Sequence, residues 1–213
     1  MIYELNIYTL KTGAAPIVVS GAGTIERQIR GDDYGKLEGF WTTEIGQLNQ
    51  VVHLWSYADF NECGRLRGEL SRNQYWASEY APLLNKYLVH RTVRLLNCVI
   101  APNGPTNEGN IYEFRNYRCR PDGLEKWVSL FLKFRSVRER YSKIVAMFTT
   151  EASLPDEVCH IWVYPHLNAL VEGRRNAVKD PEWQAFLSES VQLGLTEEMY
   201  STIMFPANHS PLK

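Results

Sequence analysis

The feature that most constrains the fold of this chain is an internal repeat. Residues 2–8 (IYELNIY) recur as residues 111–117 (IYEFRNY), and a longer stretch around His53 recurs around His160. Aligned without a gap, the longer stretches share a Thr-Thr-Glu triplet, then Val, His, Trp and Tyr, and finally Asn61/Asn168 and Arg67/Arg174. Matches in one constant register indicate a duplication, so we expect each copy to form the same structural unit.

Both copies show the same order of predicted elements. A strand of alternating polarity is followed by a helical stretch, two strands, a second helical region and a last apolar strand. In the first copy the strands are expected at 2–8, 37–44, 50–57 and 92–100, the first helical stretch at 14–31, and the second from Asp59 onward. In the second copy the strands fall at 111–117, 144–151, 157–164 and 201–205, and the first helix at 122–141. This β-α-β-β-α-β order is typical of a ferredoxin-like unit, an antiparallel sheet with both helices on one face.

The boundary between the copies is marked by composition. Residues 102–109 read PNGPTNEG, which is typical of a linker. We therefore predict a first ferredoxin-like repeat at residues 1–102, a linker at 103–110 and a second repeat at 111–213.

Side chains alternate across a strand, so each strand can be divided into two faces. The strand 50–57 has Val52, Leu54 and Ser56 on one face. Its other face is polar and aromatic, and the same is true of one face of the strands 2–8, 111–117 and 157–164. We predict that the aliphatic faces pack under the helices and the ring-bearing faces are left bare. Because so much exposed ring surface is unusual in a folded protein, the two bare faces should pair. The predicted fold class is α+β, with two tandem βαββαβ repeats whose sheets form an intramolecular α/β barrel.

This face assignment predicts a ligand cleft between the repeats. His53 and His160 are its candidate acid/base groups, because an unperturbed imidazole titrates near neutral pH. The predicted ligand-binding residues are Glu4, Asn6, Tyr8, Trp55, Tyr57, Glu113, Arg115, Tyr117, Trp162 and Tyr164. Alternatively, the histidines bond to Glu4 or Glu113, the rings only pack the sheets together, and Arg115 only pairs with a carboxylate.

Several function classes are disfavoured. The formal net charge of −1 offers no field for nucleic acid or an anionic membrane, so neither is an expected partner. The histidines lack the close spacing of a metal motif, and we expect no metal and no cofactor. The four cysteines lack a CxxC pair and are expected to be buried thiols. With a strand beginning at Ile2 and no secretory leader, we expect a cytoplasmic protein, and a homo-oligomer.

The repeated motifs also resemble those of a known family. The first copy carries Leu-x-Gly-x-Trp at 37–41, Thr-Glu-Ile-Gly at 43–46, Leu-Asn at 48–49 and Val-x-His-Leu-Trp-x-Tyr at 51–57. With the first-strand motif, this pattern resembles the NIPSNAP family across nearly the whole chain. The resemblance implies the dimeric α/β-barrel superfamily. The chain departs from the pattern at Phe148, where the motif has Trp, and at Asn6, where the motif usually has Arg. The second copy keeps this arginine as Arg115.

Two functions from different classes are consistent with these features. The first is a small-molecule-binding protein that acts as a cofactor-independent monooxygenase or isomerase, because relatives in the wider superfamily oxidise or isomerise flat aromatic compounds. The second is an interaction or scaffold protein that acts through oligomerisation, with a fully packed barrel. The family has no agreed reaction, so the resemblance specifies the fold more closely than the function.

Overall fold

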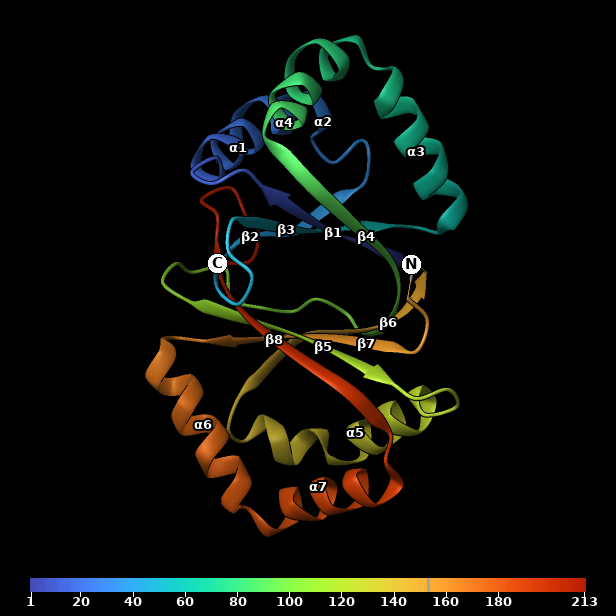
Figure 1. Ribbon diagram of the computed structural model, residues 1–213, viewed down its shortest axis with the longest axis vertical. Helices are drawn as coiled ribbons and strands as arrows, with labels where there is room; N and C mark the ends of the chain where they lie inside the picture. Colours follow the sequence, from blue (N-terminus) through green and yellow to red (C-terminus); the bar gives the residue numbers. More distant parts are fainter. Residues whose placement is uncertain (153) are drawn as a thin grey trace.

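The structure is a computed structural model that describes residues 1–152 and 154–213. In it, two helical layers enclose a closed barrel of eight strands, the first repeat forming the upper half of Figure 1 and the second the lower half. The first repeat consists of β1 (Ile2–Leu10), α1 (Ala15–Gly21), the π-helical turn η1 (Ala22–Glu26), α2 (Arg27–Arg30), β2 (Lys36–Ile45), β3 (Gln50–Tyr57), α3 (Phe60–Arg72), the π-helical turn η2 (Trp76–Tyr80), α4 (Ala81–Tyr87) and β4 (Leu88–Ile100). The second consists of β5 (Ile111–Cys119), α5 (Leu124–Glu139), β6 (Lys143–Ala152), β7 (Glu157–Tyr164), α6 (Leu167–Lys179), α7 (Pro181–Leu193) and β8 (Thr196–Pro206).

The strand order confirms two ferredoxin-like units joined into one barrel. Around the barrel the order is β1-β3-β2-β8-β5-β7-β6-β4, and all neighbours are antiparallel. The pairs β2–β8 and β4–β6 connect the repeats. The predicted α+β fold class and barrel are therefore confirmed.

Two acidic residues fix helix starts as their sequence context predicts. The Asp59 carboxylate accepts the backbone N–H of Glu62 at 2.8 Å, and Glu62 in turn accepts the N–H of Ala58 at 2.6 Å. Asp180 accepts the N–H of Glu182 at 2.8 Å, with Pro181 in the first helical position.

The last strand of each repeat is longer than predicted. β4 begins at Leu88 rather than residue 92, and β8 at Thr196 rather than residue 201. The additional residues pair only with β1 and β5 respectively, and most of them are exposed. An exposed strand extension needs no apolar alternation, so periodicity did not reveal it.

The face assignment made from the sequence is wrong, because the two faces are interchanged. The barrel interior is lined by the faces that were expected to pack under the helices, and its residues include Leu5, Val52, Leu54, Phe114 and Ile161. The ring-bearing faces lie beneath the helices in two separate clusters. Trp55 and Tyr57 belong to the cluster of the first repeat, and Trp162 and Tyr164 to that of the second.

The barrel's width and closure explain this arrangement. An eight-stranded barrel is just wide enough to be filled by side chains, and aliphatic and aromatic residues together fill most of it. The layer between sheet and helices is open at its edges, so the polar tips of large rings find partners there. Between the two sheets the structure therefore places a packed core, and not the predicted cleft.

One size exchange shows how closely this interior is packed. Trp41 of β2 and Phe148 of β6 occupy matching places in the two repeats, and both are fully buried in the barrel. A Cβ added to Gly39 would lie 2.0 Å from Cη2 of Trp41, whereas Phe148 accompanies Ala146. The departure from the family motif at Phe148 is thus compensated two residues earlier.

Polar contacts and the C-terminal tail also join the repeats. Arg94 of β4 pairs with Glu157 of β7 at 2.8 Å, and the Glu157 side chain is buried while that of Arg94 is 11% exposed. After β8 the tail crosses to the first repeat, where Ala207 donates its N–H to the carbonyl of Phe40 at 2.9 Å and the Ser210 hydroxyl accepts the N–H of Phe40 at 2.9 Å. The second repeat therefore supplies part of the packing of the first.

The cysteines follow the prediction only in part. All four are free thiols, and Cys63, Cys119 and Cys159 are buried, but Cys98 is exposed. Cys98 lies in β4, most of whose side chains are partly or fully accessible.

Candidate functional site

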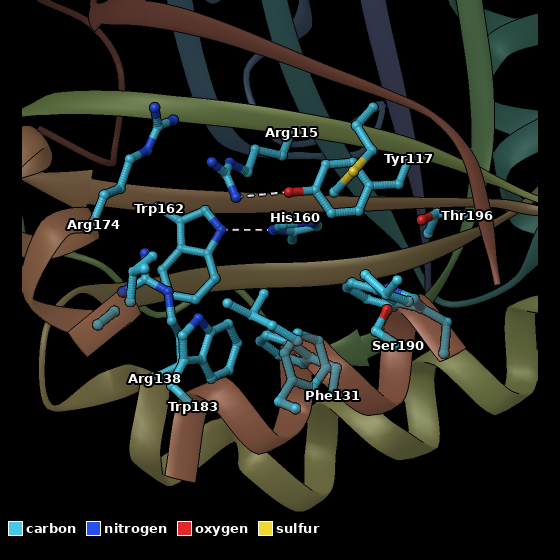
Figure 2. Close-up of a pocket in the computed structure, with 17 residues that line it drawn as sticks. Arg115, Tyr117, Phe131, Arg138, His160, Trp162, Arg174, Trp183, Ser190 and Thr196 are labelled. Atoms are coloured by element: carbon cyan, nitrogen blue, oxygen red, sulfur yellow. Dashed lines mark hydrogen bonds between the residues drawn. The ribbon is translucent and has the colours of Figure 1, made fainter. Parts of the chain in front are cut away.

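A pocket of about 320 Å³ lies in the second repeat, between the sheet and helices α5, α6 and α7 (Figure 2). Six aromatic side chains contribute to its walls, those of Tyr117, Trp127, Phe131, Trp162, Trp183 and Phe186. The volume and the apolar walls are typical of small-molecule sites.

Helical spacing brings the rings together. Trp127 and Phe131 lie one turn apart on α5 and stack with centroids 5.4 Å apart, and Trp183 and Phe186 stack at 4.3 Å on α7. Both helices place these rings over β7, where Trp162 faces them. The pocket is the space these rings leave above the sheet.

His160 is the central polar group of the pocket. It is 2% exposed and surrounded by rings, with Tyr117 edge-on at 4.8 Å and Trp127 nearly parallel at 5.8 Å. Its Nδ1 accepts the indole N–H of Trp162 at 2.6 Å (Figure 2). Its Nε2 is buried and has no hydrogen-bond partner among the described residues.

These contacts determine the protonation of His160. Burial lowers the pKa of His160 well below its usual value, and the charges of Arg115 and Arg138 lower it further, so the ring is neutral. An indole N–H can only donate, so Nδ1 carries the lone pair and Nε2 carries the proton. His160 therefore presents an N–H donor to the pocket. The lone pair on Nδ1 already accepts the Trp162 indole N–H, so this geometry favours hydrogen-bond donation over the predicted general-base role.

Three guanidinium groups surround the pocket, belonging to Arg115, Arg138 and Arg174. Arg115 donates to the Tyr117 hydroxyl at 2.6 Å. Arg138 lies against the rings of Trp162 and Trp183, with Cζ 4.8 Å and 5.7 Å from the centroids. Among the described residues lining the pocket, none is Asp or Glu.

One buried carboxylate lies beside this group of cations. Glu113 is fully buried and accepts hydrogen bonds from Arg115 at 2.5 Å, from Arg174 and from Ser201 at 2.7 Å. Burial alone would raise the pKa of Glu113, but Arg115, Ser201 and Arg174 hold it below its usual value. Glu113 is therefore ionised and neutralises part of the positive charge.

The first repeat has the same His–Trp hydrogen bond, but an arginine side chain occupies the space above it. The Nδ1 atom of His53 accepts the indole N–H of Trp55 at 2.6 Å, as in the second repeat. Above them, the Arg30 guanidinium lies 3.3 Å from the centroid of Trp55 and donates to the Tyr57 hydroxyl at 2.9 Å. Arg30 also pairs with Glu26 at 3.6 Å, and both are buried.

The predicted site residues thus form two groups. Arg115, Tyr117, His160 and Trp162 line the pocket. Glu113 and Tyr164 contact each other beside it at 3.1 Å. The predicted residues of the first repeat, Glu4, Asn6, Tyr8, His53, Trp55 and Tyr57, lie on β1 and β3, in the other half of the barrel. The two groups do not share a cleft, and their ligand-binding and catalytic roles stay predictions.

Sequence reasoning missed the residues contributed by the helices. Trp183 of α7 is buried and also lines the pocket. Arg138 and Arg174 were not singled out. One signal was available, because Arg67 and Arg174 are identical in the repeat and pair with the repeated Glu4 and Glu113. Nothing comparable marked Arg138.

Two further observations concern metals and membranes. In residues 1–152 and 154–213 there is no group of three or more His, Cys, Asp or Glu side chains placed to hold a metal ion. Over the same residues, none of the helices has the length and apolar character to cross a bilayer.

Fold and site together define an α/β-barrel protein with two fused ferredoxin-like repeats and one ring-lined pocket. The NIPSNAP family model matches residues 3–97 and 112–211, so the chain belongs to the NIPSNAP family. Protein NipSnap homolog 1 of Danio rerio is 27% identical over 220 residues, which cover all of this chain and 77% of the relative.

Solved structures share the fold at low sequence identity. A Fusobacterium nucleatum protein provisionally named a monooxygenase superimposes with a TM-score of 0.72 at 9% identity, covering 97% of this chain and 92% of its own. An anthrone oxidase-like protein gives 0.67 at 11% identity, covering 100% and 94%.

Proposed function

We propose that this protein binds a small, flat aromatic molecule in the pocket of the second repeat and acts on it as a cofactor-independent monooxygenase or isomerase. The observation that carries this proposal is the unpartnered Nε2–H of His160. A buried donor without a partner costs about 1–3 kcal/mol, so a bound oxygen atom that accepts this hydrogen bond gains a correspondingly favourable contact. The ring walls select a flat apolar body to carry that oxygen.

The same groups suit chemistry that passes through an enolate. When a proton leaves the carbon next to a ring carbonyl, negative charge develops on the carbonyl oxygen. A fixed N–H donor and nearby guanidinium groups stabilise that charge more than they stabilise the neutral ketone. An enolate can be reprotonated at another carbon, which is isomerisation, or can react with O₂.

Anthrone is a suitable test substrate, since a structure with this fold is that of an anthrone oxidase-like protein. Transfer of the C10 proton to solvent gives the enolate, and addition of O₂ with uptake of a proton from solvent gives the C10 hydroperoxide. Loss of water then leaves anthraquinone, so one anthrone and one O₂ give one anthraquinone and one water. The oxidant is O₂.

The test compares His160→Asn with His53→Asn. The Asn side-chain oxygen can still accept the Trp162 indole N–H, while the donor corresponding to Nε2 is lost. We expect His160→Asn to lower the rate of anthraquinone formation and the affinity for anthrone 10- to 100-fold, the loss of one buried hydrogen bond. His53→Asn makes the same chemical change in the first repeat and should leave both unchanged.

Equal effects of the two substitutions, or no effect of His160→Asn in a folded protein, would contradict the proposal. Thermal melting of both variants shows whether they remain folded. If the wild-type protein neither binds nor converts anthrone or related fused-ring ketones, the scaffold alternative becomes the better hypothesis.

A further inference from the structure

We infer that the ligand of the second-repeat pocket carries an acidic substituent, such as a carboxylate, and that Arg138 is the residue that selects it. This inference rests on the proposed function, because it specifies the chemical class of the molecule bound in the same pocket.

Arg138 carries a buried charge without a counter-ion. It is 5% exposed and donates to the Ser142 hydroxyl at 2.8 Å, and the neutral Tyr164 hydroxyl also interacts with it. Among the described residues, no carboxylate lies within ion-pair distance of its guanidinium. A buried cation is normally paired, because the loss of hydration is large. Contact with Trp162 and Trp183 offsets only part of that cost.

In the first repeat, the corresponding buried arginine has a carboxyl partner from the same chain. Arg30 lies over Trp55 as Arg138 lies over Trp162, and it pairs with Glu26 four residues earlier on its helix. Four residues before Arg138 the chain has Phe134. The first repeat therefore supplies its own carboxyl group to the arginine, and the second repeat leaves that place to another molecule.

The charge around the pocket favours the same class of ligand. Arg115 and Arg174 share the single carboxylate of Glu113, so the charge of Arg138 is unbalanced. The Nε of Arg174 is also buried and has no hydrogen-bond partner among the described residues. In Figure 2, Arg138 and Arg174 lie at one end of the pocket with Trp162 between them, while Ser190 and Thr196 lie at the other. An aromatic acid would place its carboxylate at the guanidinium end and its rings along the wall.

The test uses two isosteric probes, 2-naphthoate and its neutral amide 2-naphthamide, with affinities measured by calorimetry at pH 7. We expect 2-naphthoate to bind the wild-type protein at least tenfold more tightly than 2-naphthamide. Arg138→Met keeps an apolar stem and removes the charge. It should weaken the binding of 2-naphthoate alone and so bring the two affinities within about threefold of each other. Arg135→Met, at a partly exposed position of the same helix that does not line the pocket, removes one charge and should keep the tenfold preference.

Thermal melting without ligand gives an independent measurement. If the partner of Arg138 is the anionic group of the ligand, the ligand-free Arg138→Met variant should melt at the same temperature as the wild type or higher, since an uncompensated buried charge has been removed. Lower melting with an unchanged acid preference would assign Arg138 a structural role and overturn the inference. Equal binding of both probes to the wild type would also overturn it, and the proposed function would still stand if His160→Asn weakened both. If neither probe binds, the inference fails whatever the result with anthrone.

Discussion

At the scale of single residues, the two histidines are the groups whose chemistry depends most on their surroundings. His53 and His160 are each 2% exposed and bonded to an indole N–H two residues away. Burial lowers the pKa of both well below the usual value. Arg30, Arg91 and His209 add to the effect at His53, and Arg115 and Arg138 at His160. Their neutral state is thus a property of the fold.

This predicts how stability depends on pH. In the unfolded chain both histidines take up a proton below about pH 6.5, while in the folded protein they stay neutral to lower pH. The unfolded state then binds more protons, so the free energy of unfolding should fall as pH decreases from about 6.5, by up to about 1.4 kcal/mol per pH unit for each histidine. Urea denaturation at pH 5 to 8 measures this slope.

The slope should become shallower in His160→Asn and in His53→Asn, by a similar amount in each. His90→Asn makes the same substitution at an exposed position in β4 and serves as the control. An unchanged slope in the two buried-site variants would show that neither imidazole resists protonation in the folded protein.

At the scale of elements, the exchange between β2 and β6 gives a test of barrel packing. Gly39→Ala should lower the free energy of unfolding by about 3 kcal/mol or more, because the new Cβ would overlap the Trp41 ring. The double variant Gly39→Ala with Trp41→Phe reproduces the Ala146 and Phe148 pair of the second repeat. We expect it to regain at least half of the loss, as measured by chemical denaturation. A double variant no more stable than Gly39→Ala would mean that the two positions are not coupled.

Elements also show what could be read from the sequence and what could not. The repeat, the strand order and the caps at Asp59 and Asp180 depend on local patterns, and the structure confirms them. Which face of each strand meets the helices is a tertiary property. An alternation of Leu54 with Trp55 reports two faces but does not say which one is enclosed, since both kinds of side chain need burial. Four of the twelve predicted site residues still line the pocket, because strand periodicity placed Arg115, Tyr117, His160 and Trp162 on one face of the second repeat.

At the scale of the whole molecule, the barrel interior belongs to both repeats, so the chain should unfold as one unit. Arg94 in the first repeat and Glu157 in the second form a largely buried ion pair across their boundary, and Asn116 also donates to Glu157 at 2.8 Å. Arg94→Met leaves the Glu157 carboxylate without its cation. We expect a loss of about 3 kcal/mol in the free energy of unfolding, in a single transition.

Tryptophan fluorescence and far-ultraviolet circular dichroism should give the same midpoint for this variant. Arg118→Met breaks ion pairs to Glu197 and Glu198 that are exposed to solvent, and it should change the midpoint little. Separate transitions for the two signals in the wild-type protein would show that the repeats unfold independently.

The contrast between Glu26 and Phe134 has a consequence for how such a protein can evolve. When a barrel is assembled from two identical subunits, every mutation appears on both sides, and a change that closes one site closes the other. A peptide link between the halves removes that constraint. One half can then close its site with an internal ion pair, while the other half keeps an open site at some cost in stability. A single gene can thus encode two halves with different roles, which a symmetric dimer cannot have.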